Sequence, residues 1–132
     1  MMRANRFGAV KDYTLRAEEE LCLIVQVETA ETLPRITEIA AVDGVHGMFI
    51  GPADLAATMG HPGNAGHPEV VAAMQQAVRA ITAAGRPAGI LAMDPAFARV
   101  CMGWGTTFTA VGVDLSMLVA AARGLAAQFR DV

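Results

Sequence analysis

The sequence predicts an α/β fold in which short parallel strands alternate with helices. Four apolar runs rich in β-forming residues occupy residues 21–27, 45–50, 87–92 and 106–113. A segment with helical spacing or a helix-capping residue follows each run. Of the 132 residues, 54% are hydrophobic but only 5% are aromatic, a mixture that suits strands buried beneath alanine-rich helices. A repeated strand–helix order implies parallel pairing with right-handed crossovers.

Caps and apolar spacing define the expected helices, which lie at residues 30–41, 69–84, 95 to about 104, and 115–129. Thr29, Asp94 and Asp114 are expected to be N-cap residues, because their side-chain oxygens can accept hydrogen bonds from the first turn. Pro95 suits the first helical position. Gly85 is expected to end the second helix as a C-cap residue.

The chain is expected to form one domain over residues 1–132. Residues 1–20 form a polar lead with a helical turn near 11–18, and residues 21–132 form the four β/α units. Four units are half of a (β/α)₈ barrel, which needs ~250 residues. A small doubly wound sheet is the alternative at this length, and periodicity does not choose between them.

Composition excludes several classes of partner. The net charge of −3 and the scattered basic residues give no basis for nucleic-acid binding. No apolar run approaches the ~18 residues of a membrane span, and the polar N-terminus lacks a signal-peptide core. Cys22 and Cys101 are far apart in apolar stretches, so we expect buried free thiols rather than a disulfide or a metal pair. These features favour a cytoplasmic protein.

Two acidic residues follow neighbouring strands of the predicted sheet. Glu28 comes directly after the first strand and Asp54 shortly after the second. Adjacent parallel strands lie about 4.8 Å apart, so the two carboxylates can share one cation. Oxygen ligands favour Mg²⁺ or Mn²⁺. The alternative is that both acids only complement the dipoles of the helices that follow them.

Other polar features near these strand ends have weaker functional interpretations. The turn Gly51-Pro52-Ala53 leaves room for a small anion to approach the backbone, or is an ordinary connection. Gln26 lies two residues before Glu28, so both side chains can lie on the same face of the strand. There Gln26 can either bind a ligand or pack inside a barrel.

The histidines do not form a recognisable motif. His46 begins the second predicted strand, which is the wrong end of a parallel sheet for catalysis. His67 is expected to help begin a helix, and His61 is interpreted as a surface loop residue.

Several strings in order resemble the HpcH/HpaI aldolases: RANRFG (3–8), VQVET (25–29), DGVHGMFIGPADL (43–55), GN (63–64), HPEV (67–70) and FTAVGVD (108–114). The resemblance covers essentially the whole chain. It implies a (β/α)₈ barrel of which this chain supplies units five to eight, as a half barrel with parallel strands.

The resemblance also implies a site and a reaction. Glu28 and Asp54 are expected to bind a divalent metal, Mg²⁺ or Mn²⁺ and possibly Co²⁺. Gln26, Ala53 through its backbone, Asp54 and Leu91 are expected to contact the substrate. The implied reaction is reversible cleavage of a 4-hydroxy-2-oxo acid to pyruvate and an aldehyde by a class II aldolase.

In the family, the base histidine and the substrate-binding arginine lie in the first half of the barrel, before this chain begins. We therefore assign no catalytic residue here and expect the chain alone to be a weak or inactive aldolase. Open strand edges and an uncovered inner face favour a homo-oligomer or docking with a missing N-terminal half. The family also forms oligomers in which the last helix packs onto a neighbour.

Two other functions remain open at this point. One is a non-catalytic half-barrel remnant that acts as a binding or assembly module. The other is the branch of the superfamily that cleaves acyl-CoA substrates, against which the string Gly-Pro-Ala-Asp-Leu at residues 51–55 counts. The aldehyde partner, the physiological metal and the oligomer size are not fixed by the sequence.

Overall fold

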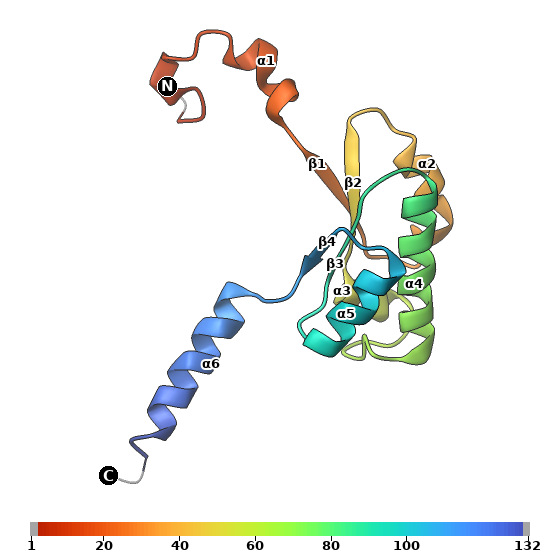
Figure 1. Ribbon diagram of the computed structural model, residues 1–132, viewed down its shortest axis with the longest axis vertical. Helices are drawn as coiled ribbons and strands as arrows, with labels where there is room; N and C mark the ends of the chain where they lie inside the picture. The colour runs from red at the N-terminus through yellow and green to blue at the C-terminus, as the bar shows by residue number, and fades with distance from the viewer. Residues whose placement is uncertain (1–2, 131–132) are drawn as a thin grey trace.

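The computed structural model, which describes residues 3–130, contains one parallel four-stranded sheet (Figure 1). Its strands are β1 (Leu23–Val27), β2 (Val45–Ile50), β3 (Ala88–Leu91) and β4 (Phe108–Ala110). They lie in the order in which they occur along the chain, and each pairs in parallel with the next. This order is that of consecutive units in a barrel rather than of a doubly wound sheet.

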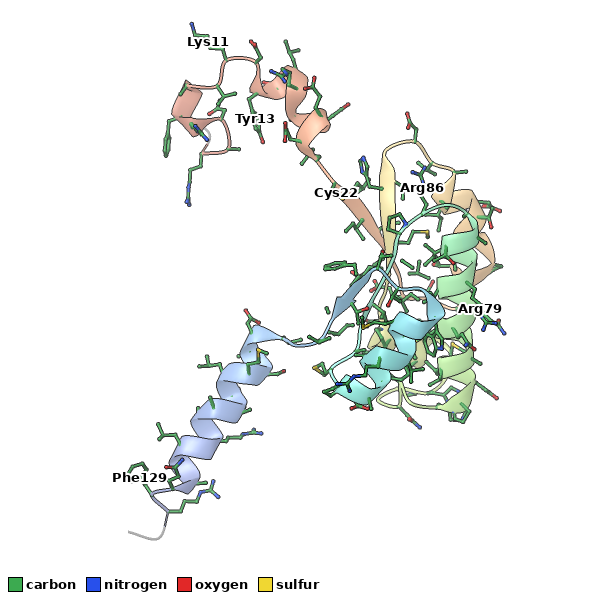
Figure 2. The ribbon with its side chains drawn as sticks, in the orientation of Figure 1. Lys11, Tyr13, Cys22, Arg79, Arg86 and Phe129 are labelled. Atoms are coloured by element: carbon green, nitrogen blue, oxygen red, sulfur yellow. The ribbon has the colours of Figure 1, made fainter. Side chains whose placement is uncertain are left out.

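Helices cover one face of the sheet (Figure 1). They are α2 (Ile36–Ala40), α3 (Pro52–Thr58), α4 (Pro68–Ala83) and α5 (Pro95–Trp104), with a 3₁₀ turn, η2 (Leu33–Arg35), before α2. Arg86 holds the connection between α4 and β3 against α2, because its Nε donates to the Ala40 carbonyl oxygen at 2.8 Å (Figure 2).

The core lies between the sheet and these helices. The strands contribute alternate side chains such as Val27, Ile50 and Ile90, which are fully buried. Helix α4 contributes a matching buried stripe at helical spacing, comprising Val70, Ala73, Met74, Ala77, Val78 and Ile81. Burying each large aliphatic side chain stabilises the fold by about 1.5–3 kcal/mol, so this layer holds the strand ends in place.

The opposite face of the sheet carries a looser aromatic cluster. Phe49 and Phe108 lie with ring centroids 5.5 Å apart, on either side of Gly89. A Cβ atom at Gly89 would come within 2.5 Å of the Phe49 ring, so a glycine in the middle strand makes room for both rings. Ile24 and Phe108 remain 43% and 54% exposed, which leaves this face open.

Two helices extend away from the sheet (Figure 1). They are α1 (Tyr13–Glu20), which follows the 3₁₀ turn η1 (Arg6–Gly8), and α6 (Asp114–Ala127); neither α1 nor α6 contains a buried residue. Among residues 3–130, no helix combines the length and the hydrophobicity needed to span a lipid bilayer.

Local signals predicted several boundaries correctly. Asp94 caps α5 by accepting hydrogen bonds from the amides of Ala96 and Phe97. Gly85 follows α4 with φ of +75°, a conformation that glycine adopts without steric cost. Helix α4 lies within one residue of its predicted range at each end.

Other expectations were wrong. The helix predicted at 30–41 is a 3₁₀ turn followed by the short α2, because Pro34 has no amide hydrogen to donate. The fourth strand covers only three residues of the predicted 106–113, because β3, its one partner, ends at Leu91, which pairs with Ala110. Asp114 is the first residue of α6, and Val113 holds the N-cap position instead.

Cys22 was also placed wrongly. Its side chain is exposed where the chain passes from α1 into β1, whereas Cys101 is buried as expected (Figure 2). Burial raises the pKa of the Cys101 thiol. Both thiols are free, in agreement with the sequence.

Candidate functional site

The carboxyl ends of β1 and β2 lie side by side. Val27 pairs with Ile50, and the amide of Gly51 donates to the Val27 carbonyl oxygen at 3.0 Å. Glu28, the next residue after β1, is thereby held beside Gly51. The parallel register thus places Glu28 beside Gly51, the residue that precedes the helix carrying Asp54.

Gly51 provides the space in which two polar side chains meet. A Cβ atom at this position would lie 3.1 Å from Glu28 Oε2 and 3.2 Å from Gln26 Nε2. The Glu28 and Gln26 side chains therefore converge over the backbone of Gly51. From the sequence, Gly51 was expected only to form part of a turn. The signal for its second role was a glycine directly after a strand.

Asp54 lies in the first turn of α3, which begins directly after Gly51. Gly51 is the N-cap residue and its carbonyl oxygen accepts from the Leu55 amide at 3.0 Å. The expected turn at 51–53 is therefore the start of a helix, since Pro52 at the first position is preorganised for one. Ala53 and Asp54 are exposed, and amides of a first helical turn have no intrahelical acceptor.

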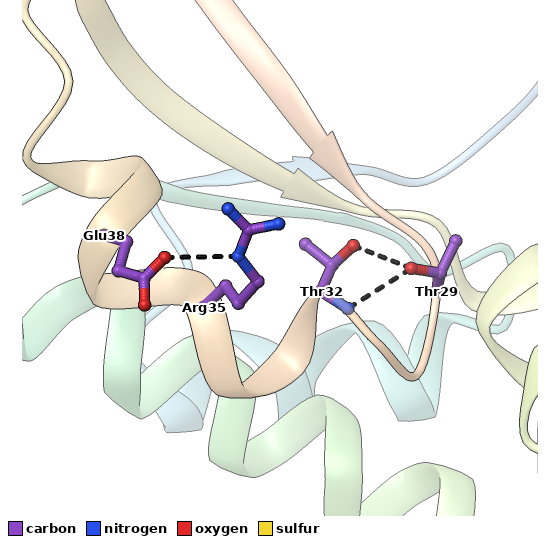
Figure 3. Close-up of polar contacts among 4 residues, drawn as sticks. All are labelled: Thr29, Thr32, Arg35 and Glu38. Atoms are coloured by element: carbon purple, nitrogen blue, oxygen red, sulfur yellow. Dashed lines mark hydrogen bonds and ion pairs between the residues drawn. The ribbon is translucent and has the colours of Figure 1, made fainter.

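The loop after Glu28 is fixed by side-chain hydroxyl groups. Thr29 Oγ1 accepts from the Thr32 amide at 3.2 Å and lies 2.7 Å from Thr32 Oγ1 (Figure 3). The ion pair of Arg35 Nε with Glu38 Oε2, 3.1 Å in length, follows one turn later (Figure 3). Thr29 thus closes a local turn rather than capping a long helix.

A second hydroxyl joins this loop to α3. Thr58 Oγ1 accepts from the Ala30 amide at 3.1 Å and donates to the Leu55 carbonyl oxygen at 3.0 Å. The segment following Glu28 is therefore tied to the helix that carries Asp54. Thr58 was not predicted from the sequence, because a single threonine at a helix end has no distinctive pattern.

The remaining predicted substrate residues lie around a cavity of about 620 Å³. Ala53 and Leu91 both line it, together with Pro52, Met93, Phe97 and Val100. Gln26 instead borders a hollow of about 320 Å³ on the open face, formed with Ile24, Phe49 and Phe108. The site thus has a polar part at Gln26 and Glu28 and a mainly apolar part at Ala53 and Leu91.

His46 lies away from these residues, as expected. It stands near the beginning of β2, where its Nδ1 accepts from the Leu23 amide at 3.0 Å. His67 is the N-cap residue of α4, with its Nδ1 accepting from the Glu69 amide at 3.3 Å. His61 is not a free surface residue: it is half-buried and contacts both His67 and Glu69.

Comparisons with known proteins identify the family and the fold. Residues 3–121 match the HpcH/HpaI aldolase/citrate lyase family. A pyruvate aldolase of Rhizobium etli is 54% identical over 98% of this chain and 51% of its own length. An HpcH/HpaI aldolase/citrate lyase family protein from Burkholderia cenocepacia superposes with a TM-score of 0.87 at 41% identity, covering 98% of this chain and 51% of that structure.

A more distant structure contains a metal. The CitE protein of Mycobacterium tuberculosis, solved in complex with magnesium and acetoacetate, is 28% identical over 67% of this chain and 43% of its own, with a TM-score of 0.58. The chain spans about half the length of the curated relatives it matches. By sequence and by fold it belongs to the HpcH/HpaI aldolase/citrate lyase family.

Proposed function

We propose that the protein contributes the metal-binding half of a class II aldolase that cleaves 4-hydroxy-2-oxo acids to pyruvate and an aldehyde. The observation that carries this proposal is the convergence of Glu28 and Gln26 over Gly51, directly before the helix that bears Asp54. The 54% identity to a pyruvate aldolase supports the reaction class.

The residues fit a divalent cation of the Mg²⁺ or Mn²⁺ type. Glu28 offers a carboxylate oxygen in a space that any residue larger than glycine at position 51 would fill, and Asp54 offers a second one from an exposed position. Hard cations prefer such oxygen ligands. When bound, the cation supplies Lewis-acid polarisation of the 2-oxo acid.

The other residues bind and orient the substrate. Gln26 Nε2 can donate a hydrogen bond to an oxygen of the 2-oxo acid, since it lies beside Glu28. The Ala53 amide can donate to the substrate carboxylate from the positive end of α3. Leu91 borders the apolar cavity that Ala53 also lines, so it excludes water from the same part of the site.

By family resemblance, the general base and the anion-binding arginine belong to the other half of the barrel. A positioned base is typically worth ~10²–10⁴ in rate. The chain alone is therefore proposed to be weakly active or inactive, and to gain activity when a family N-terminal half completes the barrel. A non-catalytic binding module would bind metal but show no activity in that mixture.

Acyl-CoA cleavage has weaker support. The chain is 54% identical to the pyruvate aldolase but only 28% identical to the CitE protein, over a smaller share of its length. Competition of coenzyme A thioesters with pyruvate would test this alternative directly, and only tight thioester binding would favour it.

Metal binding at Glu28 provides the sharpest test. Mn²⁺ titration followed by electron paramagnetic resonance should show a site whose affinity falls at least about 10-fold in E28Q, because a ligand oxygen is lost. Glu31→Gln is the matched control, since Glu31 is an exposed acid in the same loop. Equal Mn²⁺ affinity in wild type and E28Q would reject the assigned ligand.

The open face of the sheet suggests how the chain is completed. Gln26 and the aromatic pair Phe49 and Phe108 lie on that face. Helix α6 carries exposed apolar residues such as Leu115 and Leu118, and Phe129 just after it is also exposed. We propose that a second copy covers these surfaces when no N-terminal half is available.

A further inference from the structure

A cluster outside the proposed aldolase site brings together three side chains that commonly bind transition metals. His61, His67 and Glu69 each offer one ligand atom, and these atoms all lie within 4.8 Å of one another. His61 Nε2 is 3.0 Å from Glu69 Oε2. The two imidazole rings are stacked, with centroids 3.6 Å apart and planes inclined by 15°, so one ring must rotate about its side-chain bonds before both can direct a nitrogen lone pair at the same ion.

Backbone hydrogen bonds hold this cluster in shape. The His61 amide donates to the Ala56 carbonyl oxygen at 2.8 Å, the Asn64 amide to that of His61 at 3.0 Å, and the His67 amide to that of Asn64 at 3.1 Å. Gly63 provides a positive φ of +75° within the loop. Both histidines are therefore placed by the main chain, which lowers the entropic cost of bringing ligands together.

The donor atoms of the cluster favour a first-row transition-metal ion. A carboxylate facing two imidazole rings is a mixed nitrogen–oxygen donor set. Such a set suits zinc and neighbouring first-row ions, whereas the Glu28 and Asp54 oxygens suit Mg²⁺ or Mn²⁺.

We propose that His61, His67 and Glu69 form a zinc-type metal site separate from the aldolase site. Three protein ligands leave a fourth position of a tetrahedral ion for water. The hydrogen bond that the Glu69 amide donates to His67 Nδ1 is lost on binding, because the ion either takes the Nδ1 lone pair or binds Nε2 and leaves the ring proton on Nδ1. That bond is long, at 3.3 Å, and exposed, so water can replace it.

The site would act on the cavity next to it. Ala65 and Gly66 lie in the same loop, between the two histidines, and both line the 620 Å³ cavity together with Ala53 and Leu91. An ion that joins His61 to His67 therefore fixes the wall of that cavity. Metal bound at this site would therefore hold the loop that lines the apolar part of the proposed substrate site in one conformation.

The test uses the full chain with E28Q and D54N, so that binding at the aldolase site cannot contribute. Calorimetric titration with ZnCl₂ should show one site per chain, and Co²⁺ should give the absorption bands of a tetrahedral site. Affinity should fall at least about 10-fold in H61Q and in E69Q. H67N should behave likewise while keeping the helix cap, because asparagine is a good N-cap residue.

His46→Gln is the matched control, since His46 lies outside the cluster and should leave zinc affinity unchanged. The inference is overturned if zinc does not bind, or if H61Q and H67N bind it as tightly as their parent. It is also overturned if H46Q alone abolishes binding. Circular dichroism of each variant confirms that the fold is intact, and none of these outcomes depends on the aldolase proposal.

Discussion

At the scale of single residues, Gly51 determines whether two polar side chains can meet. It needs no positive φ, since its φ is −97°. Its importance lies in the space above its Cα atom, where Glu28 Oε2 and Gln26 Nε2 approach. A glycine can therefore be essential for what its neighbours do rather than for its own conformation.

Gly51→Ala should destabilise the fold by about 1–3 kcal/mol, because the new methyl group overpacks against Glu28. The Glu28 side chain should move away, so Mn²⁺ affinity should fall as well. Urea unfolding measures the first effect and a Mn²⁺ titration the second. Gly66→Ala is the control, since the nearest atom to its added Cβ is 3.8 Å away; equal stability of the two variants would contradict the packing argument.

Residue-level signals were predictable from sequence where the interaction is local. The Asp94 cap needs only the amides two and three residues later, and Gly85 needs only its own φ. Cys22 was placed wrongly because its burial depends on what packs against the start of β1. The contact of His61 with Glu69 was also missed, since it depends on how the whole loop between α3 and α4 folds.

At the scale of elements, a hydrogen bond between a loop and a helix helps to place the site. The loop after β1 would be free to move if it were held only by its strand. Thr58 on α3 accepts a hydrogen bond from the Ala30 amide in that loop. The two segments that carry Glu28 and Asp54 therefore behave as one unit.

Thr58→Val should lower the free energy of unfolding by about 0.5–1.5 kcal/mol, because the Ala30 amide and the Leu55 carbonyl oxygen both lose a partner. Thr58→Ser keeps the hydroxyl group and should stay close to wild type. Thermal or urea unfolding of both variants checks this. A serine variant as unstable as the valine variant would show that the methyl group, not the hydroxyl group, matters.

The sequence predicted which strands exist and that Glu28 and Asp54 follow two of them, because the alternation of strands and helices is visible along the chain. It did not predict α3, since a seven-residue helix that begins at Gly-Pro gives the same signal as a turn. The four-strand order of one sheet was left undecided by periodicity, and pairing of each strand with the next resolves it.

At the scale of the whole molecule, the sheet has one covered face and one open face. Helices α2 to α5 cover the first, whereas the second exposes Ile24 and Phe108. Strands β1 and β4 are edges with unpaired backbone groups on their outer sides. Such edges and apolar surface favour association with another chain.

We expect the chain to elute in size-exclusion chromatography at more than its 13.8 kDa. Phe108→Asp should shift the elution toward the monomer, because it places a charge on the open face. Val42→Asp is the control: Val42 is as exposed as Phe108, at 54% each, but lies between α2 and β2 rather than on that face. A monomeric wild-type chain at all concentrations would contradict this prediction.

Helix α6 has a consequence for how this sequence can evolve. It contributes no side chain to the core, so substitutions within its 14 residues leave the sheet and the strand ends untouched. At 1.5 Å per residue it reaches about 21 Å from its first residue. The apolar residues of α6 are therefore under selection only if they contact another surface about that far from the sheet. If that surface were lost, substitutions in α6 would accumulate without affecting the fold.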